Sequence, residues 1–418
     1  MKGLVLSRSA LVVTAVLLAG AGIAQNSAAD TLDDRATFND PHDATNRAAI
    51  QSHVIAMIDG TPAGATIRIS TFLFASGAYR DALVAAHSRG VNVQLLVDAS
   101  LTDDTSGTTF FDLANHLGRD VSGPSFAVRC PAGGGCIGTG IDHDKFFLFS
   151  STGGRSKVFV QTSANMIDHL DKGNSGLNSW NNAVTLVDEP VLYDAYVARF
   201  TAMRDRRTST PYSSTVGSNA KVYFFPRPDG DPTSVSGSTI LGVLNNIDCS
   251  GKNTTGGWGP NHLTSIHVAM FKLSDVNIAA KLWALDNAGC VVHVVRTNNG
   301  TDDDDAIARL NNCDAHNGVT IDSIHLRVDG DDNNPDAAEA IGFLHSKYLV
   351  IDGFYDGSPN QRLVWTGSYN YTTAALLHND EALLKLWNHD AIFDAFQSNF
   401  QTLAGESYQT VQAGTCSP

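Results

Sequence analysis

Residues 345–352 read His-Ser-Lys-Tyr-Leu-Val-Ile-Asp, and residues 363–370 read Leu-Val-Trp-Thr-Gly-Ser-Tyr-Asn. A similar pattern occurs earlier in the chain, where residues 143–149 read His-Asp-Lys-Phe-Phe-Leu-Phe and residues 158–165 read Val-Phe-Val-Gln-Thr-Ser-Ala-Asn. In each copy a His-x-Lys pair precedes an apolar run, and Ser-x-Asn follows. The second pair begins 202 residues after the first. This repetition predicts two halves with the same fold.

A longer block repeats on the N-terminal side of these motifs. Residues 66–72 and 265–271, which are 199 residues apart, are both strand-like, and each is followed by a helix-patterned segment and a glycine-opened strand. The helical segments are residues 79–88 and 276–287, and the second strands are residues 90–98 and 289–296. Strand–helix–strand units predict a mostly parallel sheet covered by helices. We therefore expect an α/β fold with an N-terminal half at 30–212 and a C-terminal half at 213–418.

The residue types in the motifs indicate phosphodiester chemistry. Residues two apart in a strand face the same side, so His143 should point with Lys145, and His345 with Lys347. Imidazole can attack phosphorus or transfer protons near neutral pH, and ammonium groups can stabilise charge on phosphate oxygens. We therefore expect no metal and no cofactor. A buried, hydrogen-bonded histidine beside a lysine would explain one motif, but two matching motifs disfavour that interpretation.

The composite of His345-x-Lys347-x4-Asp352 and the following Gly-Ser-x-Asn370 resembles the signature of the phospholipase D superfamily. The resemblance extends to Glu381, and the first half supplies a second, weaker match. It implies two halves packed face to face, with the active site in the cleft between them. Together with the chemistry above, it implies these site residues: His143, Lys145, His345, Lys347 and Glu381 in catalysis, Lys145, Asn165, Lys347 and Asn370 in phosphate binding, and Ser163, Asn182, Asp352 and Ser368 in support.

The two halves differ at the position of Glu381. We align Ser179-Trp-Asn-Asn182 with His378-Asn-Asp-Glu381, which makes the amide of Asn182 the counterpart of the acid. In superfamily members with two motifs, the acid after one motif usually supports the histidine of the other. On that pattern Glu381 orients His143, and Asn182 faces His345. Because a carboxylate stabilises an imidazolium, we predict His143 as the nucleophile and His345 as the acid and base.

Two smaller expectations concern the motif strands. Ser150 occupies the position at which the first motif would carry Asp. Asp352 should lie next to the end of its strand and hold a turn at Gly353, which is a structural role. A glycine-rich stretch at 133–140 lacks the Lys-Ser/Thr of a phosphate-binding loop, so we expect a surface loop closed by a disulfide.

The ends and the cysteines indicate export. A positive start and an apolar run at 10–24 are typical of a secretion signal, expected within residues 1–29, and the run is shorter than the roughly 20 residues of a membrane span. Six cysteines fit an oxidising compartment. Cys130 and Cys136 should pair with each other. Three connectivities remain open for the others, which are Cys249, Cys290, Cys313 and Cys416.

These observations lead to an expected function. The resemblance implies a secreted, extracellular phospholipase D that acts as a monomer on glycerophospholipid at a membrane or micelle surface. It would release phosphatidic acid and free headgroup through a phosphohistidine. A secreted nuclease of the same superfamily and an inactive phosphate-binding module are the alternatives. The formal charge of −15 disfavours stable nucleic-acid binding, and the intact second motif disfavours the inactive module. Headgroup and acyl preferences stay open.

Overall fold

The computed structural model describes residues 32–100, 105–168, 176–209, 211–249, 262–298, 303–311, 319–325, 342–407 and 409–412. The expected signal segment and two of the cysteines, Cys313 and Cys416, lie outside these residues. From residue 32 onward the chain forms one compact unit, so the boundary placed between residues 212 and 213 remains a prediction. None of the described helices combines the length and the apolar character that crossing a membrane would require.

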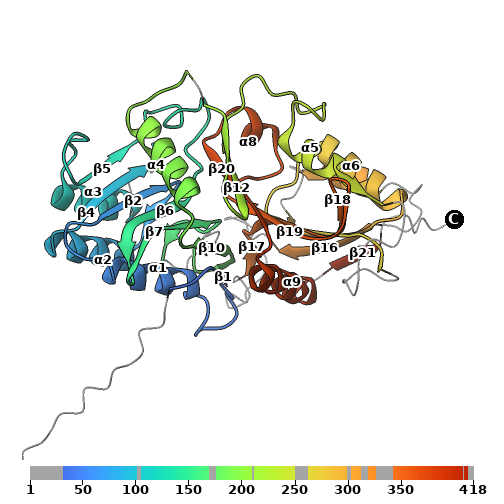
Figure 1. Ribbon diagram of the computed structural model, residues 1–418, viewed down its shortest axis with the longest axis horizontal. Coiled ribbons are helices and arrows are strands. Elements are labelled where there is room, and N and C mark those ends of the chain that lie inside the picture. The colour runs from blue at the N-terminus through green and yellow to red at the C-terminus, as the bar shows by residue number, and fades with distance from the viewer. Residues whose placement is uncertain are drawn as a thin grey trace, which may run out of the picture. The chain divides into compact units, whose positions relative to one another are not determined.

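The first half contains a seven-stranded sheet in the order β1-β10-β7-β6-β2-β4-β5 (Figure 1). Its strands are β1 (Arg35–Phe38), β2 (Thr66–Thr71), β4 (Asn92–Val97), β5 (Phe126–Arg129), β6 (Phe146–Thr152), β7 (Arg155–Thr162) and β10 (Asn182–Leu186). The helices of this half are α1 (Ala49–Asp59), α2 (Gly77–Ser88), α3 (Thr105–Leu117) and α4 (Pro190–Arg204). Two short strands, β3 (Phe74–Ala75) and β8 (Met166–Ile167), pair with each other.

The second half contains a ten-stranded sheet in the order β11-β12-β20-β19-β18-β14-β15-β16-β21, with β13 beside β18 (Figure 1). Its strands are β11 (Ser213–Val216), β12 (Ala220–Phe225), β13 (Ile247–Asp248), β14 (Ser265–Met270), β15 (Val291–Asn298), β16 (Thr320–His325), β18 (Lys347–Tyr355), β19 (Ser358–Gly367), β20 (Glu381–Trp387) and β21 (Gln409–Gln412). The helices are α5 (Thr239–Asn245), α6 (Val276–Asn287), α7 (Asp304–Leu310), α8 (Thr373–Leu377) and α9 (Asp390–Gly405). A short strand from each half, β9 (Ser179–Trp180) and β17 (Phe343–Leu344), pairs across the junction.

The repeated blocks fold into equivalent units, as the sequence predicts. In the first half β2, α2 and β4 follow one another, and in the second β14, α6 and β15 do the same. The helix starts also correspond, because Ser76 caps α2 and Asp275 caps α6 by accepting hydrogen bonds from free backbone N–H groups. The duplicated α/β fold is thus confirmed.

The expectation of mostly parallel sheets is wrong. Within the two large sheets, parallel pairing is confined to β2-β4-β5 and β14-β15-β16, and the remaining neighbours are antiparallel. The reason is that each motif strand returns through a tight hairpin. Gly153-Gly154 joins β6 to β7, and Asp356-Gly357 joins β18 to β19, all four residues having positive φ, as two-residue hairpin turns require. The turn expected at Gly353 therefore lies further on, and Asp352 is inside β18.

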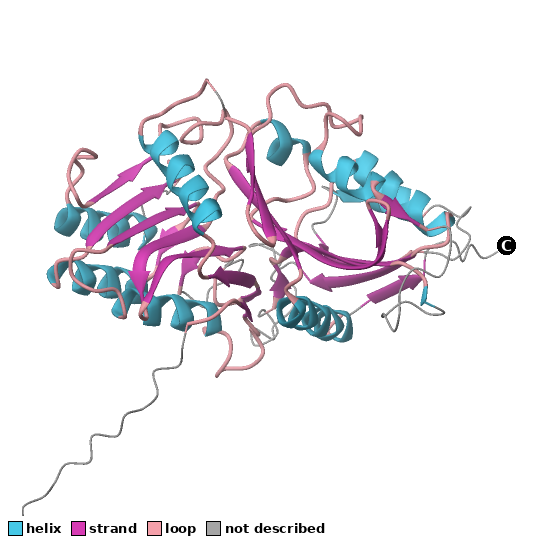
Figure 2. Ribbon diagram, in the orientation of Figure 1, coloured by secondary structure: helices cyan, strands magenta, loops and turns pink. Residues whose placement is uncertain are grey.

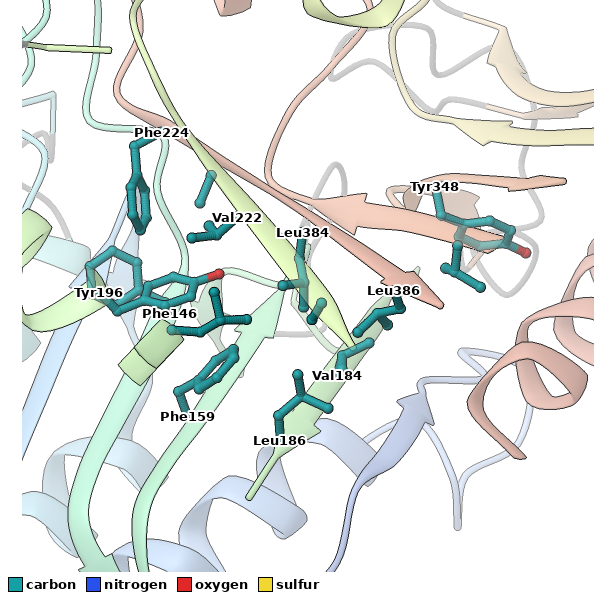
Figure 3. Packing of buried hydrophobic residues seen from close by; sticks show 14 of the residues in the cluster. Phe146, Phe159, Val184, Leu186, Tyr196, Val222, Phe224, Tyr348, Leu384 and Leu386 are labelled. Carbon is teal, nitrogen blue, oxygen red and sulfur yellow. The ribbon is translucent and has the colours of Figure 1, made fainter. Parts of the chain in front are cut away.

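The two sheets pack against each other through a shared apolar core, with helices on their outer faces (Figure 2). Figure 3 shows side chains from both halves in this core, including Phe146, Phe159 and Tyr196 from the first and Val222, Phe224 and Leu384 from the second. Helices α4 and α9 contribute apolar faces to the same cluster. Each of them contacts strands of the opposite half, α4 at β11 and β12 and α9 at β1. Face-to-face packing of the halves is thus observed.

The glycine-rich stretch forms the disulfide-closed loop that we expected, but only part of it lies at the surface. Its disulfide Cys130–Cys136 forms as predicted, but both cysteines are buried. The loop lies against the second half, because the carboxylate of Asp380 accepts hydrogen bonds from the backbone N–H groups of Ile137 and Gly138. A Cβ on Gly138 would lie 2.2 Å from the carbonyl oxygen of His378. The glycines therefore allow close backbone contact between the halves.

In the second half Cys249 is bonded to Cys290. This bond selects one of the three connectivities that the sequence left open. The remaining two cysteines, Cys313 and Cys416, lie outside the described residues.

Candidate active site

The two His-x-Lys motifs meet where the sheets join. His143 lies just before β6 and is 7% exposed, while His345 lies just before β18 and is 4% exposed. Their backbones are held by the other motif region in each case: His143 N–H donates to the Asp380 carbonyl (2.9 Å), and His345 N–H donates to the Trp180 carbonyl (2.8 Å). The duplicated fold thus brings two imidazoles to one place.

Each imidazole contacts a polar side chain at the start of a neighbouring strand. His143 Nδ1 lies 2.9 Å from both carboxylate oxygens of Glu381, from the second half. His345 Nδ1 lies 3.0 Å from Asn181 Oδ1, from the first half. The halves therefore support each other's histidine, in the crossed manner that the resemblance implies. The physical support differs, because one partner is an acid and the other an amide.

The amide that faces His345 is Asn181, and the expectation of Asn182 is wrong. Asn182 donates to the hydroxyl of Thr366 instead. Two matching serine contacts set the true register. Ser163 Oγ donates to Asn181 Oδ1 and accepts from Asn182 N–H, whereas Ser368 Oγ donates to Glu381 and accepts from the N–H of the next residue, Ala382. A one-residue shift along a strand turns a side chain to the other face, so the misaligned neighbour cannot reach the histidine.

Hydrogen bonds fix the orientation of the Asn181 amide. Its Nδ2 donates to the Gly176 carbonyl (3.0 Å) and to Ser179 Oγ (2.8 Å). Its Oδ1 therefore faces His345 and accepts from Nδ1–H. In the neutral ring this leaves Nε2 as the proton acceptor, which is the atom that a base would use.

Both lysines are 1% exposed and point to the histidine of their own motif. Lys145 Nζ donates to the His143 carbonyl (2.8 Å), and Lys347 Nζ donates to the His345 carbonyl (2.7 Å). An ammonium group has three N–H donors, so each lysine retains donors for a ligand beyond this contact within the described part of the chain. Burial lowers the pKa of both lysines, and an anion between them would stabilise their charged form.

A pair of equivalent phenylalanines lies beside these groups. Phe72 contacts the His143 ring (centroids 5.3 Å apart) and Lys145 Nζ, while Phe271 contacts the His345 ring (4.7 Å) and Lys347 Nζ. Both are partly exposed. The 199-residue repeat already pairs these two positions, and this signal could have identified them as site residues.

Charged side chains surround the His143 motif. Arg199 is buried and contacts the carboxylates of Asp144 (3.4 Å) and Asp380 (3.0 Å). Burial raises the pKa of Asp144 to about 7, although the positive charge of Arg199 lowers it. The corresponding positions near His345 carry neutral groups, Ser346 and Trp180.

Burial also determines the protonation of the two histidines. It lowers the pKa of His143 and of His345, and the nearby lysines act in the same direction. Burial raises the pKa of Glu381 to about 8, although both lysines oppose this shift. Above that pH, the Glu381–His143 pair retains one proton between the carboxylate and Nδ1, so Nε2 has a free lone pair. Below it the pair gains a second proton, and Nε2 no longer acts as a nucleophile.

Other predicted residues have less direct positions. Ser163 and Ser368 bind the amide and the acid, as described above. Asn165 is buried and Asn370 partly exposed, each two residues after one of these serines, and their role toward phosphate remains a prediction. Asp352 pairs in register with Ser265, five residues along β18 from Lys347, which is roughly 17 Å at the rise of a strand. Ser150 Oγ accepts from Thr66 N–H.

A metal ion has no evident site near the histidines in the described residues. The group of potential ligands found there comprises Cys130, Cys136 and Asp142, but the two cysteines are bonded to each other. Disulfide sulfur is not a thiolate ligand.

Comparisons with known proteins agree with this geometry. Residues 262–404 match the family described as "Cardiolipin synthase, PLD-like domain". Polyphosphate kinase from Porphyromonas gingivalis has a similar structure (TM-score 0.53, 13% identity), with 88% of this chain aligned to 50% of that one. Phosphatidylserine synthase from Haemophilus influenzae Rd KW20 is also similar (TM-score 0.54, 10% identity), with 88% of this chain aligned to 87% of that one.

No curated protein matches the chain significantly in sequence, and the chain spans half the length of the polyphosphate kinase. The family match covers the second motif and its acid, and the duplicated fold supplies the first motif. Residues 262–404 are therefore similar to this PLD-like family, and the two solved structures share the fold of the chain.

Proposed function

We propose that the chain is a secreted phospholipase D that hydrolyses a glycerophospholipid to phosphatidic acid and the free headgroup. The observation that carries this proposal is the crossed arrangement of His143 with Glu381 and His345 with Asn181 beside two buried lysines. Such a site can supply a nucleophile, a proton donor and positive charge for a phosphodiester. These are the groups that its hydrolysis requires.

The reaction has two steps. His143 Nε2 attacks phosphorus, the bond from phosphorus to the headgroup oxygen breaks, and His345, which enters this step as the imidazolium, gives its Nε2 proton to that oxygen. His345 then takes a proton from water, the water oxygen attacks phosphorus, and the phosphorus–nitrogen bond breaks to release phosphatidic acid. Lys145 and Lys347 stabilise the charge on the non-bridging oxygens in both steps.

The choice of a lipid substrate rests on this chain's own residues. The two structural neighbours carry names for different reactions, so their likeness supports the fold alone. A formal charge of −15 disfavours a nucleic acid, and Phe72 and Phe271 give the site partly exposed apolar walls. Two disulfides support an oxidising compartment and thus secretion.

The test is a panel of vesicles with different headgroups, with plasmid DNA in parallel, all in the presence of a chelator. We expect release of headgroup and phosphatidic acid without added metal, and no cleavage of DNA. Lys347→Gln should abolish the activity, whereas His116→Ala, at an exposed position on α3, serves as a folded control. Cleavage of DNA but not lipid would favour the nuclease. Activity that requires a divalent ion would contradict the lysine-based mechanism.

A further inference from the structure

A groove of about 320 Å³ lies on the second sheet, away from the histidines. Its walls include Lys221, Lys385, Tyr355 and Trp387, and Asp356 and Ser358 lie at its exposed hairpin end. The aromatic residues of the groove belong to the same apolar cluster as helices α5, α6 and α8. The groove therefore lies on the face of the second sheet that these helices partly cover. None of these residues takes part in the chemistry described above.

Two lysines lie directly opposite each other in this groove. Lys221 on β12 pairs in register with Lys385 on β20. Like charges at directly opposed positions destabilise an antiparallel sheet. Within the described part of the chain, neither ammonium group forms an ion pair with a carboxylate. A local conflict of this kind is expected at functional or strained sites.

Aromatic rings hold both ammonium groups in place. Lys385 Nζ lies 4.7 Å from the ring centre of Tyr355, 5.1 Å from that of Trp365 and 5.6 Å from that of Trp387. Lys221 Nζ lies 4.4 Å from the ring centre of Tyr223. Rings attract cations without neutralising them. Burial lowers the pKa of both lysines, and Lys221 lowers that of Lys385 further, while Asp356 opposes the shift.

We propose that this groove binds the phosphate group of a phosphate monoester. Such a group carries close to two negative charges at neutral pH, which matches two ammonium groups, whereas a carboxylate carries one. The Ser358 hydroxyl offers a neutral donor at the rim. Because the chain as a whole is strongly acidic, general attraction of anions does not account for binding here.

The test counts bound phosphate by calorimetry with inorganic phosphate and the intact chain. The groove and the active site should each take one ion, so we expect two per chain. The double variant Lys221→Gln/Lys385→Gln should bind one phosphate ion, in the active site. Lys347→Gln should also bind one phosphate ion, in the groove. This comparison separates failure of the groove from failure of the active site. Lys157→Gln removes a charge from an exposed ion pair elsewhere and should still bind two.

Folding of the double variant is checked in buffer without phosphate. Its thermal midpoint should equal or exceed that of the natural chain, because a like-charge pair has been removed, and added phosphate should raise it less. Vesicles with phosphatidic acid then identify the source of the ligand. Binding to them at least tenfold tighter than to free phosphate indicates a lipid headgroup, and weaker binding indicates a soluble ester. Unchanged phosphate stoichiometry in the double variant would overturn the proposal.

Discussion

The surroundings of His143 and of His345 differ in charge although the two motifs correspond residue by residue. His143 contacts the acid Glu381, and His345 contacts the amide Asn181. The difference extends to two further pairs of equivalent positions, Asp144 and Ser346, and Asp380 and Trp180. Duplication thus provides two similar imidazoles, and the charges near each ring distinguish their roles.

The charged side suits the nucleophile. When an imidazole nitrogen attacks phosphorus, the ring gains positive charge, and a carboxylate at the other nitrogen stabilises it. The neutral side suits proton transfer, because an amide fixes the Nδ1 proton without stabilising a positive charge on the ring. His345 can therefore release its proton readily to a leaving oxygen. Four experiments test this comparison.

The largest effect is expected from His143→Ala, which removes the nucleophile. We expect no phosphoryl adduct and background activity on every substrate. His345→Ala should slow lipid hydrolysis by roughly 10²- to 10⁴-fold, but an activated nitrophenyl phosphodiester should recover most of the loss, since its leaving group needs little protonation. Quenched-flow mass spectrometry measures the adduct. An adduct on His345 in the natural chain would reverse the two roles.

Glu381→Gln makes both sides amides, and we expect adduct formation to fall by roughly 10- to 100-fold. In the natural chain this rate, measured with the activated substrate, should rise with pH through about 8, because the pair must lose a proton before Nε2 can attack. The variant should lack this step, since an amide does not titrate. If the step persists in the variant, another group controls the nucleophile.

Asn181→Asp gives His345 the support that His143 has. A carboxylate beside an imidazole favours the charged ring, so the pKa of His345 should rise by roughly 1 to 3 units. NMR titration of the His345 ring protons measures the shift, with Asn182→Asp as the matched neighbour that faces away from the ring. An equal shift from both variants would contradict the observed register.

The smallest effects are expected from the two serines. Ser368 donates to a charged carboxylate and Ser163 to an amide, so Ser368→Ala should destabilise by roughly 1.5–3 kcal/mol and Ser163→Ala by roughly 0.5–1.5 kcal/mol. Ser368 also lowers the pKa of Glu381, so its loss should move the step near pH 8 to higher pH. Denaturant unfolding and the pH profile measure these changes. If Ser368→Ala and Ser163→Ala lowered the free energy of unfolding equally, the hydrogen-bond partners Glu381 and Asn181 would not differ in charge.

Much of the site could be predicted because the chain repeats itself. The spacing of the two His-x-Lys pairs and the repeated strand–helix–strand blocks were accessible from residue types in order. The crossed partnership of Glu381 with His143 was implied by the resemblance to the phospholipase D superfamily. The geometry of a strand makes such patterns informative, since alternate residues share a face. The motif strands contain continuous apolar runs that are buried on both faces, and such runs are typical of core strands.

The register of Asn181 could not be predicted in this way. Two asparagines stand side by side at 181 and 182, and residue type alone does not distinguish them. The choice depends on which one the Ser163 hydroxyl and the His345 ring can reach, and those partners come from distant parts of the chain. Only the pairing of the halves decides it.

The duplication, the α/β units and the residue types of the site can be inferred from the order of the amino acids, because these depend on local periodicity and on spacing. Tertiary structure decided the hairpins that make the sheets largely antiparallel, the docking of the loop at Gly138 against the second half, and the opposition of Lys221 and Lys385. These features arise from contacts between segments far apart in the chain. Local sequence pattern does not encode such distances, so the fold is needed to bring them together.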